Sequence, residues 1–137
     1  MSDFGAIQFL LPSLPENGDR ILLFLQDLAT ERNWHPELAE RILQAGSEAF
    51  INGMEHGNGY NPSKTVEFTL LQQCGFIQIT VQDQGSGFDP DALPDPLAED
   101  RLLASGGRGV FLMRYWADEV RFEDEGRRVV LRFNMEP

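Results

Sequence analysis

GSEAFINGMEHGN, residues 46–58, combines an apolar helical stripe with an unusual set of polar side chains. Because an α-helix turns about 100° per residue, Glu48, Asn52 and Glu55 lie along one side of it. Gly57 can end the helix, since glycine adopts the backbone conformation that commonly follows a helix C-terminus. The segment therefore predicts a helix whose final turns present an acid, an amide and a second acid beside a loop.

The chemistry of Glu48 and Asn52 has three explanations at this point. Their side-chain oxygens suit a hard cation such as Mg²⁺, which takes oxygen ligands and keeps several waters. Glu48 could equally be a general base that acts through one water. A solvated helix face is the third explanation and, for this helix taken alone, the commonest. His56 is well explained as a favourable partner of the helix dipole or as a packing residue.

The rest of the chain predicts a single α+β domain over residues 1–137. The order is strand, two helices, hairpin, irregular segment, helix, hairpin, which indicates a two-layer sandwich of helices on one face of a mixed, mainly antiparallel sheet. The apolar core stripe of the second helix is expected at Leu38, Ile42, Ala45, Ala49 and Phe50. The expected strands are 6–11, 65–71, 76–82, 120–124 and 127–134, and the expected helices are 20–34, 36–57 and 110–119.

Composition limits the function classes. The formal net charge is −11 and the pI about 4.4, so the surface repels phosphate backbones and direct nucleic-acid binding is not expected. No apolar run approaches the roughly 20 residues that span a bilayer, and the N-terminus lacks the basic start of a signal peptide. We therefore expect a cytoplasmic protein without a membrane segment. The single cysteine, Cys74, cannot form an internal disulfide.

Two glycine-rich segments follow the helix. DQGSG places Asp83, Gly85 and Gly87 directly after an apolar strand. An aspartate there can accept hydrogen bonds from an exocyclic amine such as that of adenine, and glycines two apart allow a close backbone approach. Glycine-rich turns are common, so an ordinary turn is the alternative.

The second segment, SGGRG, places Gly107, Arg108 and Gly109 before a predicted helix. Backbone N–H groups at such a position can bind phosphate, and the arginine can add charge. The long Gly-, Pro- and Asp-rich stretch between the two segments is typical of a functional loop, often a lid. Neither segment matches the GxxxxGK[ST] phosphate loop.

The order of the three motifs is more specific than any one of them. Glu-x-x-x-Asn on a helix, Asp-x-Gly-x-Gly after a strand and Gly-x-Gly before a helix resemble the motifs of the GHKL ATPases. Within that superfamily the chain is similar to the small serine/threonine kinases that act as anti-sigma factors. The resemblance runs through LPSLPENGDRILLFLQDL, SEAFINGMEHGN, DQGSGFDPDALPDP and GGRGVFLMRYWADEVRF, and it implies a Bergerat-type, histidine kinase-like ATP-binding fold.

The resemblance also implies roles for individual residues. Glu48 would be the general base that activates the acceptor hydroxyl, and Asn52 would hold the Mg²⁺ that bridges the phosphates of ATP. Asp83 would read adenine, and Gly85 and Gly87 would shape the floor of the pocket. Residues 88–106 correspond to the ATP lid, followed by the phosphate-contacting Gly107 and Gly109, with Arg108 as a helper.

The partners implied by the resemblance are a sigma factor and a STAS-type anti-anti-sigma protein, the latter phosphorylated on serine or threonine. The alternative is a nucleotide-binding switch that sequesters its partner with little or no kinase turnover. Relatives commonly dimerise, so a homodimer is open as well. Arg20 matches a partner-facing arginine of some relatives, although an ordinary surface arginine is the simpler explanation. Gly53 departs from the alanine of many relatives and costs helix stability of roughly 1 kcal/mol.

Overall fold

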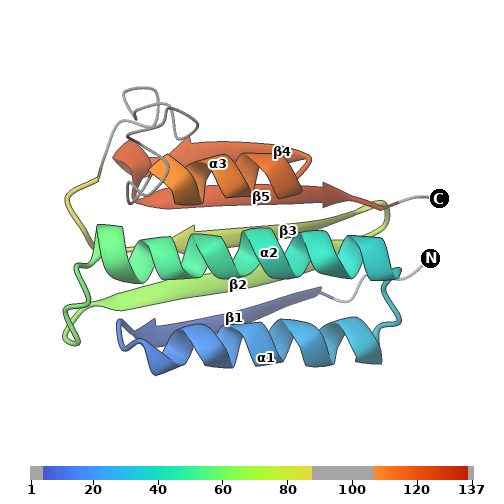
Figure 1. Cartoon of the computed structure of the whole chain (residues 1–137), viewed down its shortest axis with the longest axis horizontal. Coiled ribbons are helices and arrows are strands. Elements are labelled where there is room, and N and C mark those ends of the chain that lie inside the picture. Colours follow the sequence, from blue (N-terminus) through green and yellow to red (C-terminus); the bar gives the residue numbers. More distant parts are fainter. Residues whose placement is uncertain (1–4, 88–106, 136–137) are drawn as a thin grey trace.

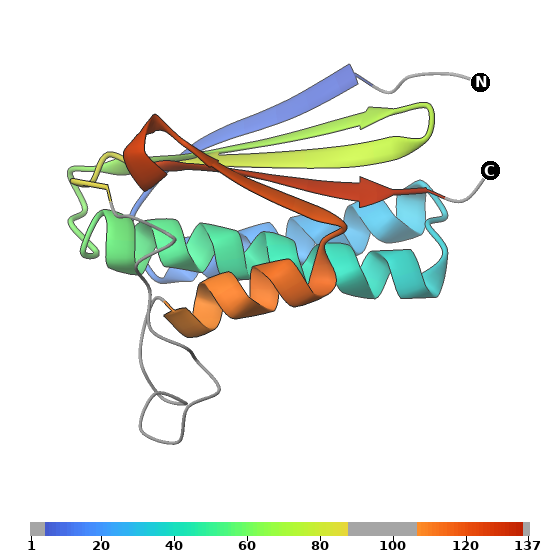
Figure 2. The same ribbon diagram turned by 90° about the horizontal axis from the view of Figure 1, so that it is seen from above.

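The structure is a computed structural model that describes residues 5–87 and 107–135. It has two layers, a five-stranded sheet and a layer of helices on one of its faces (Figures 1 and 2). The strands are β1 (Gly5–Pro12), β2 (Thr65–Gln73), β3 (Phe76–Gln82), β4 (Glu119–Glu123) and β5 (Arg128–Asn134), and the helical elements are α1 (Glu16–Glu31), α2 (Pro36–Asn52), the π-helical turn η1 (Gly53–Gly57), α3 (Gly107–Trp116) and the 3-10 turn η4 (Asp124–Gly126).

The strand order is β1-β2-β3-β5-β4, and each of these described pairings is antiparallel. The expected two-layer α+β arrangement is confirmed. The sheet was expected to be mixed and mainly antiparallel, and no parallel pair occurs among the described strands. The β2–β3 and β4–β5 hairpins reverse the chain, and β5 runs back beside β3, which leaves every neighbouring pair antiparallel.

The core lies between the sheet and the helices. The predicted stripe of α2 is buried throughout, with Ile42 and Phe50 at 0% exposure. Strands β2 and β3 alternate buried and half-buried residues as their sequences predict. The buried positions of these strands point toward the helices and are Val66, Phe68, Leu70, Gln72, Ile77, Ile79 and Val81.

Helix α1 begins at Glu16, earlier than the sequence pattern indicated. The polar stretch before Arg20 is helical because its side chains have partners: Asn17 is buried, and its amide donates to the carbonyl of Pro12 at 2.8 Å. Glu16 and Asp19 lie in the first turn, where negative charge is favourable.

The α-helical part of the second helix ends at Asn52, whereas one helix through Gly57 was expected. The chain continues as the π-helical turn η1, in which the Asn58 N–H donates to the Gly53 carbonyl at 2.9 Å. Such turns are rare and are found mostly at functional sites. None of the described helices has the length and apolar character that crossing a membrane requires.

Candidate active site

One end of the sandwich gathers the residues of all three motifs. Helix α2 and η1 end there, β3 ends there in the DQGSG turn, and α3 begins there (Figure 1). These segments are far apart in the sequence, and the fold brings them to the same end of the sandwich. The motifs therefore face a common region, as their order in the sequence indicated.

Gly109 joins the first and third motifs. A methyl group added at its Cα would lie 3.4 Å from Asn52 Oδ1 and 3.4 Å from Glu48 Oε2. Two side-chain oxygens of α2 therefore face the first turn of α3 at Gly109, and no side chain of residue 109 stands between them and the α3 backbone. This gap is available because residue 109 has no side chain.

Glu48 is half-buried in this arrangement, and burial raises the pKa of its carboxyl group. The positive charge of Arg108 opposes this rise, Glu55 adds to it, and His56 opposes it. A carboxylate with a raised pKa is a better proton acceptor than an exposed one. The charge effect also places Arg108, from the third motif, within electrostatic range of the first.

Asp83 packs against the end of the same helical segment. A methyl group at Gly57 would overlap its carboxylate, and one at Gly85 would overlap the Gly57 carbonyl. The Gly85 N–H donates to Asp83 Oδ1 at 2.8 Å. The two glycines thus allow the DQGSG turn to lie directly on η1, with the aspartate between them.

Burial raises the pKa of Asp83 too, and the Gly85 N–H and the charge of Arg127 oppose the rise. The Asp83 N–H donates to the Arg127 carbonyl at 2.9 Å, which fixes the backbone at the strand end. The carboxylate is therefore half-buried and held by a single described hydrogen bond at one oxygen. Its other oxygen is left with the acceptor capacity that an amine would use.

The β4–β5 turn supports this region, which the sequence did not indicate. Gly87 has a φ of 85°, and a methyl group there would overlap the Glu125 carbonyl and lie 3.2 Å from Arg127 Nη1. Asp124 and Glu125 have left-handed φ values of 51° and 56°, which non-glycine residues seldom adopt. A turn this constrained keeps its carbonyls and charges at a fixed position beside the DQGSG segment.

Asn58 was also missed as a structural residue. Its side chain is 4% exposed, and its amide donates to Ser13 Oγ at 2.8 Å and to the Thr65 carbonyl at 2.9 Å. Its Oδ1 accepts from the Gln84 N–H at 2.7 Å. One side chain thus ties the β1–α1 loop, the start of β2 and the residue after Asp83. The only signal in the sequence was its place after the helix-ending glycine.

Comparison with known proteins agrees with this geometry. Residues 11–133 match the model of the histidine kinase-like ATPase domain. The chain belongs to this family of ATPase domains. Membership implies ATP as the nucleotide that the domain binds.

The curated relatives of this ATPase domain include kinases and anti-sigma factors. It is 26% identical over 131 residues to the serine-protein kinase RsbW of Oceanobacillus iheyensis, covering 91% of this chain and 83% of that protein. It is 30% identical over 133 residues to RsbW of Bacillus licheniformis, covering 85% and 77%. It is 33% identical over 91 residues to the anti-sigma F factor of Geobacillus stearothermophilus, covering 65% and 62%.

A solved structure shares the fold of this ATPase domain. The crystal structure of the RsbU and RsbW domains of a Mycobacterium tuberculosis protein superimposes with a TM-score of 0.63 at 16% identity. The match covers 96% of this chain and 31% of that one, so this chain spans about a third of that protein.

The oxygen donors of the ATPase domain at this end fit a particular kind of cation site. In the described part of the chain, no group of three or more His, Cys, Asp or Glu side chains could enclose a metal ion. Asn52 Oδ1 is instead an open, hard oxygen donor that faces Gly109, with Glu48 Oε2 beside it as the candidate proton acceptor. A single protein oxygen suits Mg²⁺, which keeps waters and takes other ligands from nucleotide phosphates.

Some predicted residues of the ATPase domain are not tied to the site. The proposed lid, residues 88–106, lies outside the described residues. Gly107 is the first residue of α3, next to Arg108. Arg20 is exposed on α1. His56 Nε2 lies 3.4 Å from Oε1 of its neighbour Glu55, and both residues are exposed.

Proposed function

We propose that this domain is an ATP-dependent protein serine/threonine kinase that acts as an anti-sigma factor. It would phosphorylate a STAS-type anti-anti-sigma protein and sequester a sigma factor. The observation that carries the proposal is the meeting of Glu48, Asn52 and Gly109, because it sets a proton acceptor and a cation ligand against the backbone where α3 begins. Phosphoryl transfer needs mainly positioning and charge neutralisation. These residues would supply the positioning, and Arg108 and the Mg²⁺ that Asn52 would hold would supply the positive charge.

Glu48 is the residue proposed to accept the proton of the acceptor hydroxyl. As the serine or threonine oxygen bonds to phosphorus, its proton would pass to Glu48 Oε2, and the bond between that phosphorus and the leaving nucleotide oxygen would break. Burial raises the pKa of this carboxyl, which favours the transfer. Asn52 Oδ1 would hold Mg²⁺, whose charge offsets that of the phosphates when it is bound.

Asp83 is proposed to receive the exocyclic amine of adenine, and Gly85 and Gly87 to shape the floor of that pocket. The half-buried carboxylate has one oxygen bonded to the Gly85 N–H, so the other can accept from the base. Gly107, Gly109 and the charge of Arg108 are proposed to contact the phosphates.

A nucleotide-dependent sequestering module with little turnover is the second candidate. The relatives named anti-sigma F factor favour it, because their name describes binding rather than transfer. The two functions share the nucleotide site and differ only in whether Glu48 moves a proton.

The test is transfer of radiolabelled phosphate from ATP to a STAS-domain protein that co-purifies with the chain. Glu48→Gln is the test variant, and Glu55→Gln, an exposed acid further along the same helical segment, is the matched control. We expect the label to reach serine or threonine with the wild type and with Glu55→Gln. Glu48→Gln should abolish transfer while calorimetry still detects ATP binding.

Each other outcome has a defined meaning. Stoichiometric, nucleotide-dependent complexes without phosphoprotein in the wild type would support the sequestering module. Undiminished transfer in Glu48→Gln would remove the assigned role of Glu48. The absence of binding heat with Mg-ATP or ADP at millimolar concentration would contradict both functions.

A further inference from the structure

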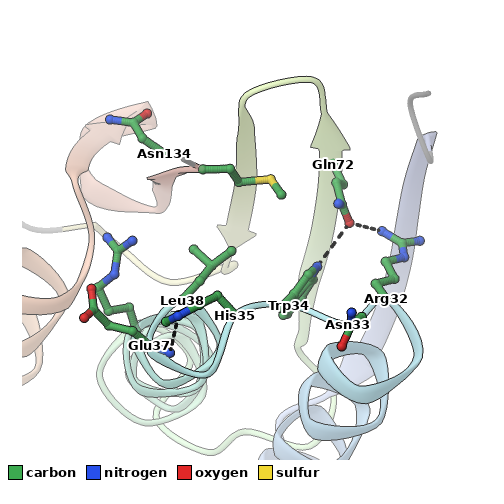
Figure 3. Close-up of a pocket in the computed structure, with 10 residues that line it drawn as sticks. Arg32, Asn33, Trp34, His35, Glu37, Leu38, Gln72 and Asn134 are labelled. Atoms are coloured by element: carbon green, nitrogen blue, oxygen red, sulfur yellow. Dashed lines mark hydrogen bonds between the residues drawn. The ribbon is translucent and has the colours of Figure 1, made fainter. Parts of the chain in front are cut away.

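A pocket lies at the end of the sandwich that carries the α1–α2 loop, opposite the candidate active site (Figures 1 and 3). Its volume is about 430 Å³, and its walls come from the α1–α2 loop, the first turns of α2 and the ends of β2 and β5. Leu38, in its wall, precedes Glu48 by nearly three turns of α2, or about 15 Å at 1.5 Å per residue. The pocket is therefore separate from the nucleotide site.

Gln72 is the residue that breaks the pattern of the core here. The positions of β2 that point toward the helices are Val66, Phe68 and Leu70, and Gln72 continues this row although it is polar. It is only 6% exposed. A buried amide in an apolar row costs free energy unless it is hydrogen-bonded, so its partners need to be accounted for.

The carbonyl half of the Gln72 amide is fully used. Its Oε1 accepts from Arg32 Nη1 at 2.8 Å and from the indole N–H of Trp34 at 3.3 Å (Figure 3). These two donors fix which way the amide is turned. Its Nε2 has no acceptor within residues 5–87 and 107–135, and the residue lines the pocket. The pocket wall therefore contains a fixed N–H₂ donor that no residue of the described part of the chain accepts from.

The charges around the pocket favour an anion in an otherwise acidic protein. Arg32 lies in the wall, and α2 begins there with its positive dipole end, capped by His35, whose Nδ1 accepts from the Glu37 N–H at 3.2 Å. Three carboxylates oppose this field. Glu31 is exposed and interacts electrostatically with Arg32. Glu37 is exposed, and Asp118 is held by Arg41 at 2.8 Å.

We propose that this pocket binds a small molecule bearing a carboxylate, which accepts from Gln72 Nε2 within the positive field of Arg32 and the start of α2. The carboxylate supplies the acceptor that the amide lacks, and the apolar remainder of the ligand lies against Leu38 and Met135, which also line the cavity. A hydrogen bond to a charged group is the stronger kind, so the amide is a substantial part of the affinity.

Gln72→Glu tests the proposal with little change in shape. The new carboxylate still accepts from Arg32 and Trp34, so the fold is retained, but it replaces the N–H₂ donor with a negative oxygen. Gln73→Glu adds the same charge to the neighbouring residue, whose side chain lies on the other face of β2, and is the matched control. Both are made in a Trp116→Phe background so that Trp34 is the only tryptophan.

The probes are succinate and, as its neutral counterpart, succinamide, each titrated at constant ionic strength. Binding is followed by Trp34 fluorescence and by the NMR signals of the Gln72 side-chain amide and the Trp34 indole N–H. We expect saturable shifts with succinate in the parent and in Gln73→Glu, with at least about tenfold weaker binding in Gln72→Glu and with succinamide. ATP affinity, measured in parallel, should not change in either variant.

Two results would overturn the proposal. One is the absence of a saturable shift in either NMR signal at millimolar succinate, which would mean that the pocket holds only water. The other is equal succinate affinity in Gln72→Glu and the parent, which would place the anion elsewhere. Failure of ATP binding in the same samples would count against the proposed kinase instead, so the two proposals can fail separately.

Discussion

The Cα of Gly57 lies directly against the carboxylate of Asp83, so that any side chain at position 57 would overlap it. These residues come from different motifs, one from the end of the helix and one from the end of β3. Their contact sets the height of the DQGSG turn above η1. The glycine after His56 is therefore needed for position rather than for helix termination alone.

We expect Gly57→Ala to weaken ATP binding strongly and to destabilise the fold by about 1–3 kcal/mol, the usual cost of forcing atoms into a packed site. Gly53→Ala is its control within the same turn. Gly53 has helical backbone angles, and a methyl group there would lie 3.4 Å from Val66 Cγ1 and 3.5 Å from Val81 Cγ1, in ordinary contact. It should be neutral or stabilising by up to about 1 kcal/mol. Urea unfolding and calorimetry with ATP measure both effects, and equal losses in the two variants would contradict this account.

Asn58 gives a prediction about stability. Asn58→Ala removes three hydrogen bonds and leaves the buried Ser13 hydroxyl and the Gln84 N–H without this partner. We expect a loss of about 2–4 kcal/mol in the free energy of unfolding. Asn61 is exposed, and its side chain bonds to nearby Ser63, so Asn61→Ala should cost less than about 1 kcal/mol. A similar small loss for both would show that Asn58 does not tie the three segments together.

Much of the fold followed from local patterns. The alternation in β2 and β3 and the helical stripe from Leu38 to Phe50 each depend on which residues face a core, and these predictions were confirmed. The start of α1 and the π-helical turn were not predicted. The start of α1 depends on the side-chain hydrogen bond of Asn17 to the Pro12 carbonyl, and the π-helical turn lies against Asp83 from the end of β3. Residue-by-residue propensity contains neither contact.

The site shows the same division. The resemblance of the three ordered motifs to those of the GHKL ATPases implied that Glu48, Asp83 and Gly109 belong to one site. It could not indicate the support from Asn58 or from the Asp124–Arg127 turn, whose residues carry no motif of their own. Their importance comes from hydrogen bonds and carbonyl contacts that exist only once β5 lies beside β3.

Gly109→Ala tests the gap between α2 and α3. Its new methyl group would sit 3.4 Å from Asn52 Oδ1 and from Glu48 Oε2, a contact that the fold can accept. We therefore expect a melting temperature close to that of the wild type but Mg-ATP binding at least about tenfold weaker, since the methyl group occupies the approach to both oxygens. Gly18→Ala, which meets the flexible end of Met54 at 3.4 Å, controls for adding a methyl group to a helix. Unchanged Mg-ATP affinity in Gly109→Ala would mean that phosphate and metal bind elsewhere.

Glu48→Gln should stabilise the protein at neutral pH while it removes phosphate transfer. Burial raises the pKa of Glu48 in the folded state, so the folded protein holds this proton more tightly than the unfolded chain does. The stability that protonation provides is present below the unfolded pKa of about 4.3 and is lost as the pH rises through the folded pKa. Glutamine is neutral at every pH and avoids that loss.

Thermal unfolding of both proteins from acid to neutral pH should therefore show a higher melting temperature for Glu48→Gln near pH 7 and a difference that shrinks toward pH 4. Glu55→Gln, at an exposed position, should show a much smaller change. If Glu48→Gln is instead less stable than the wild type at neutral pH, the attraction between Glu48 and Arg108 outweighs the cost of burying the carboxylate.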